Sequence, residues 1–367
     1  MKSYTLCELC SIHYGKDHRY LEDGDIPAFG SGGLMRKVNK AIYTGPSVLI
    51  PRKGSLSNLF YVDDPFWTVD TLFWTKINQT LVIPKYLYYI LGSQNLASLN
   101  EGSAVPSLTV KTLSELVLQI PPLNQQRKIV SLLEPLETKI NVNRQINDNL
   151  EQLAESYFQK LFIDNACSDW TLGTISDLGT VVGGGTPSKS KPEYYTTNGI
   201  GWVTPKDLSI SKSKFISHGA NDITELGLKN SSACVMPEGT VLFSSRAPIG
   251  YIAIASGKVT TNQGFKSVVP KPEIGTAFVY YFLKHNLPII EGMASGSTFK
   301  EVSGSIMRNV PVVIPDAEIL AKFGEFCDSI FVQQKILEEQ NQSLASLRDV
   351  LLHKSMSGTL DVSKLNI

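Results

Sequence analysis

One stretch of this chain is repeated 194 residues downstream, and the repeat constrains the fold more than any other feature. The first copy, "GSAVPSLTVKTLSELVLQIPPL", runs from Gly102 to Leu123, and the second, "GSTFKEVSGSIMRNVPVVIPDA", runs from Gly296 to Ala317. They align without a gap, and each contains a glycine-serine loop, a short amphipathic piece and an apolar strand that ends in proline. A duplicated junction predicts a duplicated architecture, in which two modules are built on one plan.

A long segment with helical periodicity follows each copy. The residue at every seventh position is mostly apolar, and heptads sustained over several turns favour a coiled-coil seam. The predicted seam residues are Ile129, Leu136, Asn143, Leu150, Tyr157, Phe323, Ile330, Leu337, Leu344 and Leu351. Asn143, Asn147 and Asn341 are the kind of polar insertion that sets the register of a coiled coil. The shared register favours two helices that pack on each other, although each helix could instead pack on its own globular module.

The segments before the two junctions are rich in short β-type runs broken by glycine, proline, asparagine and aspartate. "GPSVLIPRKGSL" (Gly45 to Leu56) parallels "EGTVLFSSRAPIG" (Glu238 to Gly250), and "TVDTLFW" parallels "TTNQGFK". A helical candidate precedes each junction, at 84–93 and at 276–286. We therefore predict an α+β fold with an internal pseudo-two-fold repeat, in which two β-rich globular domains are separated by two long helices packed as an antiparallel coiled coil.

Composition excludes several classes of protein. The 367 residues suffice for two or three domains, and their five cysteines, an odd number, argue against a disulfide framework and for a reducing compartment. No apolar run is long enough to cross a membrane, and the N-terminus lacks the apolar core of a secretory signal. We therefore expect a cytoplasmic protein. The formal net charge of zero gives no general sign of nucleic-acid binding.

Motifs for catalysis or metal binding are missing from the sequence. The glycine triplet at 183–185 is not followed by the Gly-Lys-Ser/Thr of a P-loop, and no Asn/Asp-Pro-Pro-Tyr tetrapeptide of an amino-methyltransferase occurs. Cys7 and Cys10 lie too close to His13 for a zinc finger, and no second Cys-x-x-Cys follows. We expect a non-catalytic chain without a metal site.

Several stretches, in the same order along the chain, resemble the specificity subunit of type I restriction-modification enzymes. They are "IPAFGSGG", "GPSVLIPRKGSL", "FWTVDTLFW", "IPPLNQQRKIVSLL", "GGGTPSKSKPEYY", "WVTPKDLS", "GLKNSSACVMPEGTVLFSSRAPIG" and "TTNQGFKSVVP". The resemblance implies two target recognition domains, each of which reads one half of a bipartite sequence in double-stranded DNA. It also implies two helices that pack antiparallel, set the gap between the half-sites and dock the modification subunits. The second helix opens with "IPDAEIL" and lacks the Pro-Pro-Leu and glutamine that usually open it in this family.

The resemblance also implies the partners and the domain boundaries. Two modification (methyltransferase) subunits and the restriction/translocase subunits are expected to bind this chain. We expect this chain to bind no cofactor, and S-adenosylmethionine, ATP and magnesium to reside on those partners. The expected divisions are recognition domain 1 at 1–120, the first spacer helix at 121–165, recognition domain 2 at 166–314 and the second spacer helix at 315–367.

Candidate DNA contacts follow from residue chemistry. Lysine and arginine neutralise phosphates, whereas asparagine, glutamine, arginine and threonine can read base edges. The candidates are Arg36, Lys37, Lys40, Arg52, Lys53, Thr71, Thr186, Lys189, Lys191, Lys206, Arg246, Asn262, Gln263 and Lys266. Gly183 to Gly185 add backbone N–H groups suited to phosphate. Each of these residues could equally be a turn or surface residue, and an assembly scaffold whose modules bind protein is the alternative function.

Overall fold

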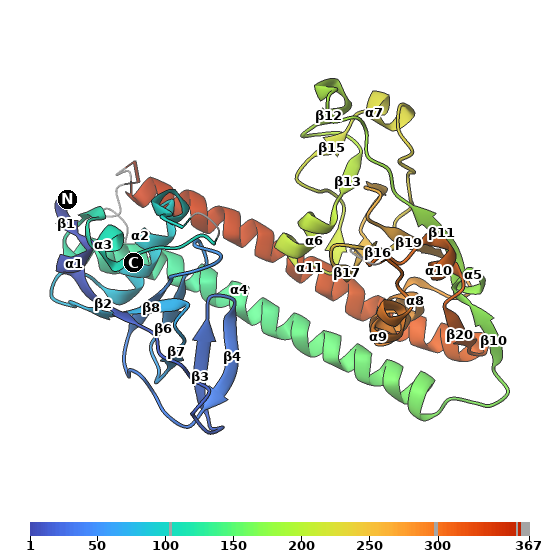
Figure 1. The fold of residues 1–367 in the computed structure, drawn as a ribbon, viewed down its shortest axis with the longest axis horizontal. Coiled ribbons are helices and arrows are strands. Elements are labelled where there is room, and N and C mark those ends of the chain that lie inside the picture. The colour runs from blue at the N-terminus through green and yellow to red at the C-terminus, as the bar shows by residue number, and fades with distance from the viewer. Residues whose placement is uncertain (103–104, 297–299, 357–358, 361–367) are drawn as a thin grey trace. The chain divides into compact units, whose positions relative to one another are not determined.

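A computed structural model describes residues 1–102, 105–296, 300–356 and 359–360 of the chain (Figure 1). Residues 103–104 and 297–299 of the repeated junction, and the last residues of the second spacer segment, lie outside the described residues. The chain divides into two compact units. Unit 1 comprises Met1–Ile140 and Ser343–Ile367, and unit 2 comprises Asn141–Gln342.

Unit 1 is built on a four-stranded sheet, a three-stranded sheet, a two-stranded ribbon and short helices. The strands pair in the orders β2-β8-β5-β6 and β4-β3-β7, and β1 pairs with β9. Every residue of β5 is buried, because this strand lies inside its sheet and packs against the helices. The bounds are β1 Lys2–Thr5, α1 Leu6–Leu9, β2 Cys10–Tyr14, β3 Ile26–Gly30, β4 Gly33–Val38, β5 Ser47–Pro51, β6 Phe60–Val62, β7 Trp67–Thr68, β8 Leu72–Ile77, α2 Pro84–Gly92, a 3-10 turn Leu96–Leu99, α3 Val110–Ser114 and β9 Val117–Ile120.

Unit 2 repeats this plan with a larger sheet. Its central sheet has the order β11-β19-β16-β17-β14, and three two-stranded ribbons join β12 to β15, β13 to β18 and β10 to β20 (Figure 1). The bounds are β10 Thr171–Thr174, α5 Ile175–Leu178, β11 Gly179–Gly183, a 3-10 turn Pro192–Tyr194, β12 Tyr195–Thr196, β13 Gly201–Val203, α6 Pro205–Ser211, β14 Phe215–Ile216, β15 Asp222–Ile223, α7 Glu225–Lys229, β16 Val241–Ser245, β17 Ile249–Ala255, β18 Val259–Thr261, β19 Lys266–Pro270, α8 Thr276–His285, α9 Leu287–Gly292, α10 Gly304–Arg308 and β20 Pro311–Ile314.

The repeated junction has equivalent structure in both units. The short helices α3 and α10 each begin with a hydroxyl cap, because Thr109 accepts the N–H of Thr112 and Ser303 accepts that of Ile306. The strand that follows pairs antiparallel with the first strand of its own unit, as β1-β9 and as β10-β20. These ribbons end at Ile120 and Ile314.

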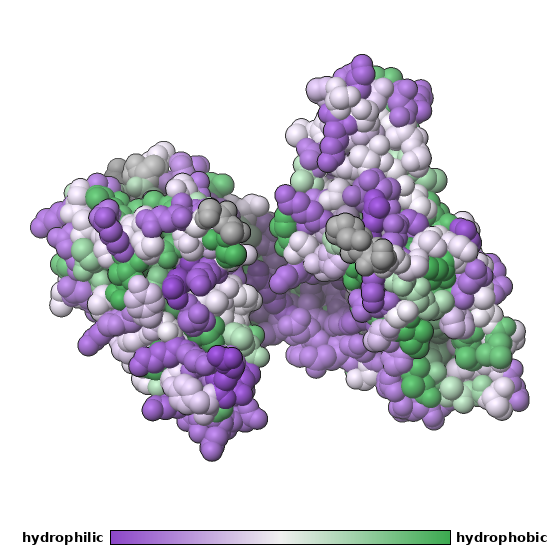
Figure 2. Space-filling model, viewed as in Figure 1, coloured by the Kyte–Doolittle hydropathy of each residue, from purple (hydrophilic) through white to green (hydrophobic). Residues whose placement is uncertain are grey.

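The outer faces of these two ribbons differ in polarity. In unit 1 Ser3 lies opposite Gln119, whose amide donates a hydrogen bond of 2.8 Å to the serine hydroxyl. In unit 2 Leu172 lies opposite Val313, and the two side chains are 81% and 44% exposed. Figure 2 shows apolar residues gathered over this part of unit 2. The shared backbone plan therefore carries different surfaces.

Two long helices, α4 (Leu123–Phe158) and α11 (Ala317–Met356), contribute residues to both units. In unit 2 they run antiparallel, since the ring centres of Tyr157 and Phe323 lie 6.0 Å apart and Asn143 donates to Asn341 Oδ1 at 3.0 Å. In unit 1 the two helices share one apolar cluster, which includes Ile129 of α4 and against which Leu351 of α11 packs. A π-helical segment, Gln159–Asp164, continues α4.

The predicted seam residues divide into two groups by burial. Ile129, Asn143, Phe323, Ile330 and Leu337 are buried. Leu136, Leu150, Tyr157, Leu344 and Leu351 are partly exposed. Asn143 is fully buried, so its bond to Asn341 replaces water as the partner of its Nδ2 group, whereas its Oδ1 accepts no hydrogen bond from the described residues.

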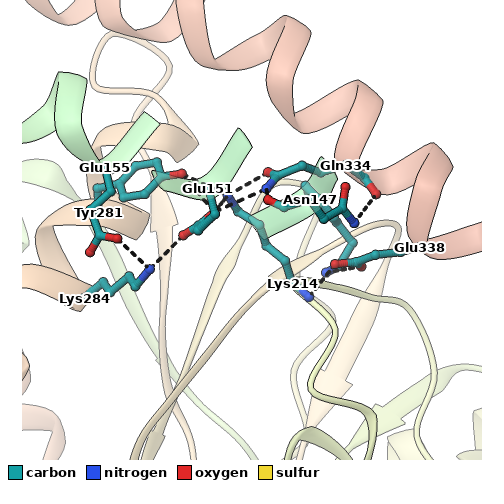
Figure 3. Close-up of polar contacts among 9 residues, drawn as sticks. Asn147, Glu151, Glu155, Lys214, Tyr281, Lys284, Gln334 and Glu338 are labelled. Atoms are coloured by element: carbon teal, nitrogen blue, oxygen red, sulfur yellow. Dashed lines mark hydrogen bonds and ion pairs between the residues drawn. The ribbon is translucent and has the colours of Figure 1, made fainter. Parts of the chain in front are cut away.

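A buried lysine ties the sheet of unit 2 to the helices α4, α8 and α11 (Figure 3). The ammonium of Lys214, which precedes β14, donates to Glu151 at 2.7 Å, to Gln334 at 3.0 Å and to the Tyr281 hydroxyl at 3.1 Å. Its nitrogen also lies 3.9 Å from the centre of the Phe331 ring. A charge removed from water requires such partners, and here each of three helices supplies one.

Two further groups complete this cluster. Lys284 of α8 binds Glu151 at 2.8 Å, and Glu338 of α11 accepts the main-chain N–H groups of Lys214 and Phe215 at 3.0 and 3.2 Å. Burial disfavours ionisation of Glu151, but the charge and hydrogen bonds of Lys214 and Lys284 outweigh burial and lower the pKa of this carboxyl to about 2. The carboxylate is therefore the stable form at neutral pH.

Replacing Lys214 with alanine is expected to lower the free energy of unfolding of unit 2 by about 3–5 kcal/mol, because a buried carboxylate loses its main partner. Denaturant unfolding followed by tryptophan fluorescence measures the loss. The control is Lys258→Ala, at an exposed lysine in the turn before β18, which is expected to stay within about 0.5 kcal/mol of the parent. Equal effects of the two changes would contradict a structural role for the Lys214 cluster.

Acid is expected to weaken unit 2 through Glu151. Its folded-state pKa is depressed from 4.5 to about 2, so its contribution is complete above the unfolded value and is lost as the pH falls toward 2. Glu151→Gln should therefore be less stable than the parent at pH 7 and should lose less stability between pH 5 and pH 2. Urea unfolding at a series of pH values tests this, and parallel pH profiles of parent and variant would refute it.

Candidate nucleic-acid interface

A cleft of about 750 Å³ in unit 2 brings together predicted residues that are far apart in the sequence. They come from the loop after β11, from the start of α6, from the β16–β17 turn and from the loop between β18 and β19. The predicted residues that line the cleft are Thr186, Lys189, Lys206, Arg246, Asn262 and Gln263. The cleft thus combines cations with amide and hydroxyl groups, which can contact phosphates and base edges respectively.

The amide pair of this cleft is held by local hydrogen bonds. Asn262 Oδ1 accepts the N–H of Gly264 at 2.9 Å, and the Thr186 hydroxyl donates to Gln263 Oε1. Each amide oxygen therefore has one protein donor already. Arg246 precedes Ala247, whose φ of 50° is unusual for a residue with a side chain and marks a constrained turn at the rim of the cleft.

The loop at 183–185 packs so closely against the main chain of a neighbouring loop that it requires glycine. A Cβ at Gly184 would lie 2.0 Å from the carbonyl oxygen of Asn262, so only glycine fits there. The N–H of Gly185 donates to Thr261 at 2.8 Å, and Trp202 Nε1 donates to the Gly185 carbonyl at 3.0 Å. The Gly185 N–H, which the sequence suggested for phosphate, therefore holds the loop in place.

The other two predicted cations of unit 2 form ion pairs. Lys191 lies 3.8 Å from Glu193, and both side chains are more than half exposed. Lys266 is mostly covered and lies 3.5 Å from Glu301, which is also 3.5 Å from Arg246. Of these three cations, Arg246 alone lines the 750 Å³ cleft.

In unit 1 the predicted residues do not share one cleft. Thr71 lines a cleft of about 690 Å³, where its hydroxyl accepts the N–H of Ser31 at 3.2 Å. Arg52 donates to the carbonyl of Asp70 at 3.1 Å and lies over the ring of Tyr14, at 5.4 Å from its centre. Lys37, Lys40 and Lys53 are exposed.

The side chain of Arg36 is bonded to the protein itself rather than free to contact a ligand. Its guanidinium donates to the carbonyl groups of His18 and Leu21 and lies 3.6 Å from a carboxylate oxygen of Asp23. The side chain therefore holds the loop 18–23 against β4.

The structure adds residues that sequence reasoning missed. Asp17, Arg19 and Asp70 line the cleft of unit 1, and Tyr195 and Trp202 line that of unit 2. Arg19 and Asp17 form a bidentate pair on the surface, at 2.9–3.1 Å. The segment "KDHRY" offered charge as its only signal, and an isolated run of charges does not identify a cleft.

The described residues also bear on two other classes of site. Over those residues, no group of three or more histidine, cysteine, aspartate or glutamate side chains is arranged to hold a metal ion. Within the same ranges, no helix combines the length and apolar content needed to cross a bilayer.

Comparison with known proteins connects this geometry to a family. The family model described as "Type I restriction modification DNA specificity domain" matches residues 1–152 and 167–346. The type I restriction enzyme MjaIX specificity subunit of Methanocaldococcus jannaschii is 37% identical over 194 residues, which are 50% of this chain and 45% of that protein. The HindI specificity subunit of Haemophilus influenzae is 23% identical over 411 aligned residues, which cover 89% of each chain.

A solved structure shares the fold over nearly the whole length. The crystal structure of a type I restriction-modification system S subunit from M. genitalium matches with a TM-score of 0.60 at 17% identity, and the match covers 97% of this chain and 96% of that one. The matched domain recognises DNA and is not a catalytic domain. Because the family match covers most of both units, this chain belongs to the type I restriction-modification specificity subunit family.

Proposed function

We propose that this chain reads a bipartite target in double-stranded DNA, with one half-site contacted by each unit. The observation that carries the proposal is the cleft of unit 2, in which six residues chosen for DNA chemistry converge from four separate segments. Cations supply affinity for phosphate, while the amides of Asn262 and Gln263 supply groups that can discriminate bases. The repeat supports a second, related surface on unit 1.

The same proposal extends to the partners. The chain would direct two adenine methyltransferase subunits and the restriction/translocase subunits to the target, and those partners would carry S-adenosylmethionine, ATP and magnesium. The two helices would set the gap between the half-sites. The protein would act in the cytoplasm. Support for these points comes from family membership.

A scaffold whose modules bind protein remains the competing function. The two proposals differ in sequence-specific DNA binding, which a gel-shift experiment with a library of duplexes measures directly. Mapping methylated adenines in the host genome with and without the gene then identifies the target. A DNA-reading subunit predicts loss of methylation at one bipartite motif, whereas a scaffold predicts no selected sequence in the library.

The two units are expected to read their half-sites independently. Replacing Arg52 and Lys53 with alanine should weaken and relax selection at one half of the target, whereas Asn262→Ala with Gln263→Ala should act on the other half. Each lost base contact is expected to cost about 1–3 kcal/mol. Binding selection on a library randomised in both half-sites reads out each position. If both double variants weakened every position equally, a two-unit reading of DNA would be wrong.

Substitution of two adjacent cations of unit 1, Arg36 and Lys37, is expected to have different effects. The comparison distinguishes a residue that stabilises the fold from one that contacts DNA. Arg36→Ala should lower the free energy of unfolding by about 1–3 kcal/mol, because two partly buried carbonyl groups lose their donor. Lys37→Ala should leave stability within about 0.5 kcal/mol and, if Lys37 contacts a phosphate, should make the dependence of log affinity on log salt shallower by about 0.9. Denaturant unfolding and salt titrations of DNA binding measure the two effects. The reverse pattern would place Arg36, rather than Lys37, at the DNA surface.

A further inference from the structure

One carboxylate next to the unit 2 cleft is shared by two cations, of which Arg246 lines the cleft. Glu301 Oε2 lies 3.5 Å from Arg246 Nη1, and Glu301 Oε1 lies 3.5 Å from Lys266 Nζ. Arg246 belongs to both the 750 Å³ cleft and a neighbouring pocket that Glu301 lines. The same guanidinium that the proposed function assigns to DNA is therefore already paired with an acidic group of the protein.

The main chain keeps this carboxylate beside Arg246. The N–H of Glu301 donates to the Ser295 carbonyl at 2.9 Å, and the N–H of Ser295 donates back to Glu301 at 3.1 Å. The next residue, Val302, donates to the carbonyl of Ser245 at 3.0 Å, and Ser245 directly precedes Arg246. Glu301 and Arg246 thus lie on two hydrogen-bonded segments, so the ion pair follows from the backbone of the junction.

Unit 1 has the same junction with a serine at the position of Glu301. There Leu108 donates to the carbonyl of Arg52 at 2.9 Å, and Lys53 forms a β-bridge with Ser107. Lys53 therefore corresponds to Arg246, and Ser107 corresponds to Glu301. A serine hydroxyl carries no charge. The acidic residue of this hairpin is Glu101, which lies at the position of Ser295 and accepts a hydrogen bond from the hydroxyl of Thr112, and within the described residues Lys53 forms no ion pair.

We propose that Glu301 competes with DNA phosphate for Arg246 and Lys266, so that unit 2 binds DNA of arbitrary sequence less readily than unit 1. This inference rests on the proposed function. DNA that offers only phosphates must replace an existing ion pair, which gains little free energy and leaves Glu301 facing negative charge. A target half-site offers additional base contacts that offset this exchange. Glu301 then determines how strongly unit 2 discriminates its target from other DNA.

The test measures binding of the full chain to a short duplex of random sequence at several concentrations of potassium chloride. Glu301→Gln keeps the shape of the side chain and removes its charge. It is expected to bind this duplex roughly two- to fivefold more tightly, since an exposed ion pair contributes that order of free energy. The slope of log affinity against log salt should steepen by about 0.9 for each phosphate gained. A loss of packing alone would not steepen this slope.

Three further variants test whether the change in binding is due to the charge of Glu301 itself. Glu301→Asp retains the charge and should bind as the parent does. Glu291→Gln removes a second carboxylate of the same pocket, one on α9 that is not paired with Arg246 or Lys266, and should change the salt slope less. Ser107→Glu introduces the carboxylate into unit 1 and should weaken binding and flatten the slope.

The outcomes separate this inference from the function on which it rests. If the parent binds the duplex and Glu301→Gln binds it with the same affinity and the same salt slope, the proposed role of Glu301 is overturned. The proposed reading of DNA is then unaffected. Equal effects of Glu301→Gln and Glu291→Gln would also overturn it, because general charge would then suffice. A parent chain that binds no duplex at any salt concentration would overturn the proposed function and this inference together.

Discussion

Both units depend on one kind of interaction. In each, a glutamate of α4 accepts a hydrogen bond from a tyrosine of the helix that precedes the junction. In unit 1 the Tyr89 hydroxyl donates to Glu137 at 3.0 Å, and in unit 2 the Tyr281 hydroxyl donates to Glu151 at 3.1 Å. The two glutamates are 14 residues apart, which is two heptads of the same helix. Each pair lies where the sheet, its short helix and the long helices of one unit meet. A recognition surface can discriminate bases only if its loops are held still, and these contacts hold the loops through the elements that carry them.

The two units use this contact with different surroundings. Glu151 is joined by the buried Lys214 and by Lys284, whereas Glu137 lies 3.9 Å from Arg348 and its pKa is raised, chiefly because of burial. Unit 2 thus surrounds its glutamate with two lysines, whereas in unit 1 the glutamate has one arginine beside it. The same backbone plan tolerates both solutions because in each unit the carboxylate that packs against the sheet and helices has hydrogen-bond or ionic partners.

The sequence predicted the parts of this structure that depend on local pattern. Heptad spacing predicted two long helices, and the junction repeat predicted a short amphipathic piece followed by an apolar strand in each module. The pairing of each strand in a ribbon and the hydroxyl cap of each short helix were not predicted. The convergence of Lys206 with Arg246 and Gln263 could be suspected from chemistry alone, but no spacing in the sequence placed them in one cleft. The Lys214 cluster was missed, because "SKSKF" resembles a solvated loop and its partners lie 63 and 120 residues away. Glu301 was missed for the same reason, since its role depends on a main-chain contact with the strand β16.

The bonds that close each junction, from Leu108 to Arg52 and from Val302 to Ser245, involve only backbone atoms. Such a bond forms with almost any side chain at either position, so natural selection can change the residues that face a ligand without first repairing the architecture. Sequence divergence should then run ahead of structural divergence throughout this lineage. A relative that aligns over 89% of the chain at 23% identity, and a solved structure that shares the fold at 17% identity, show how far that drift has gone.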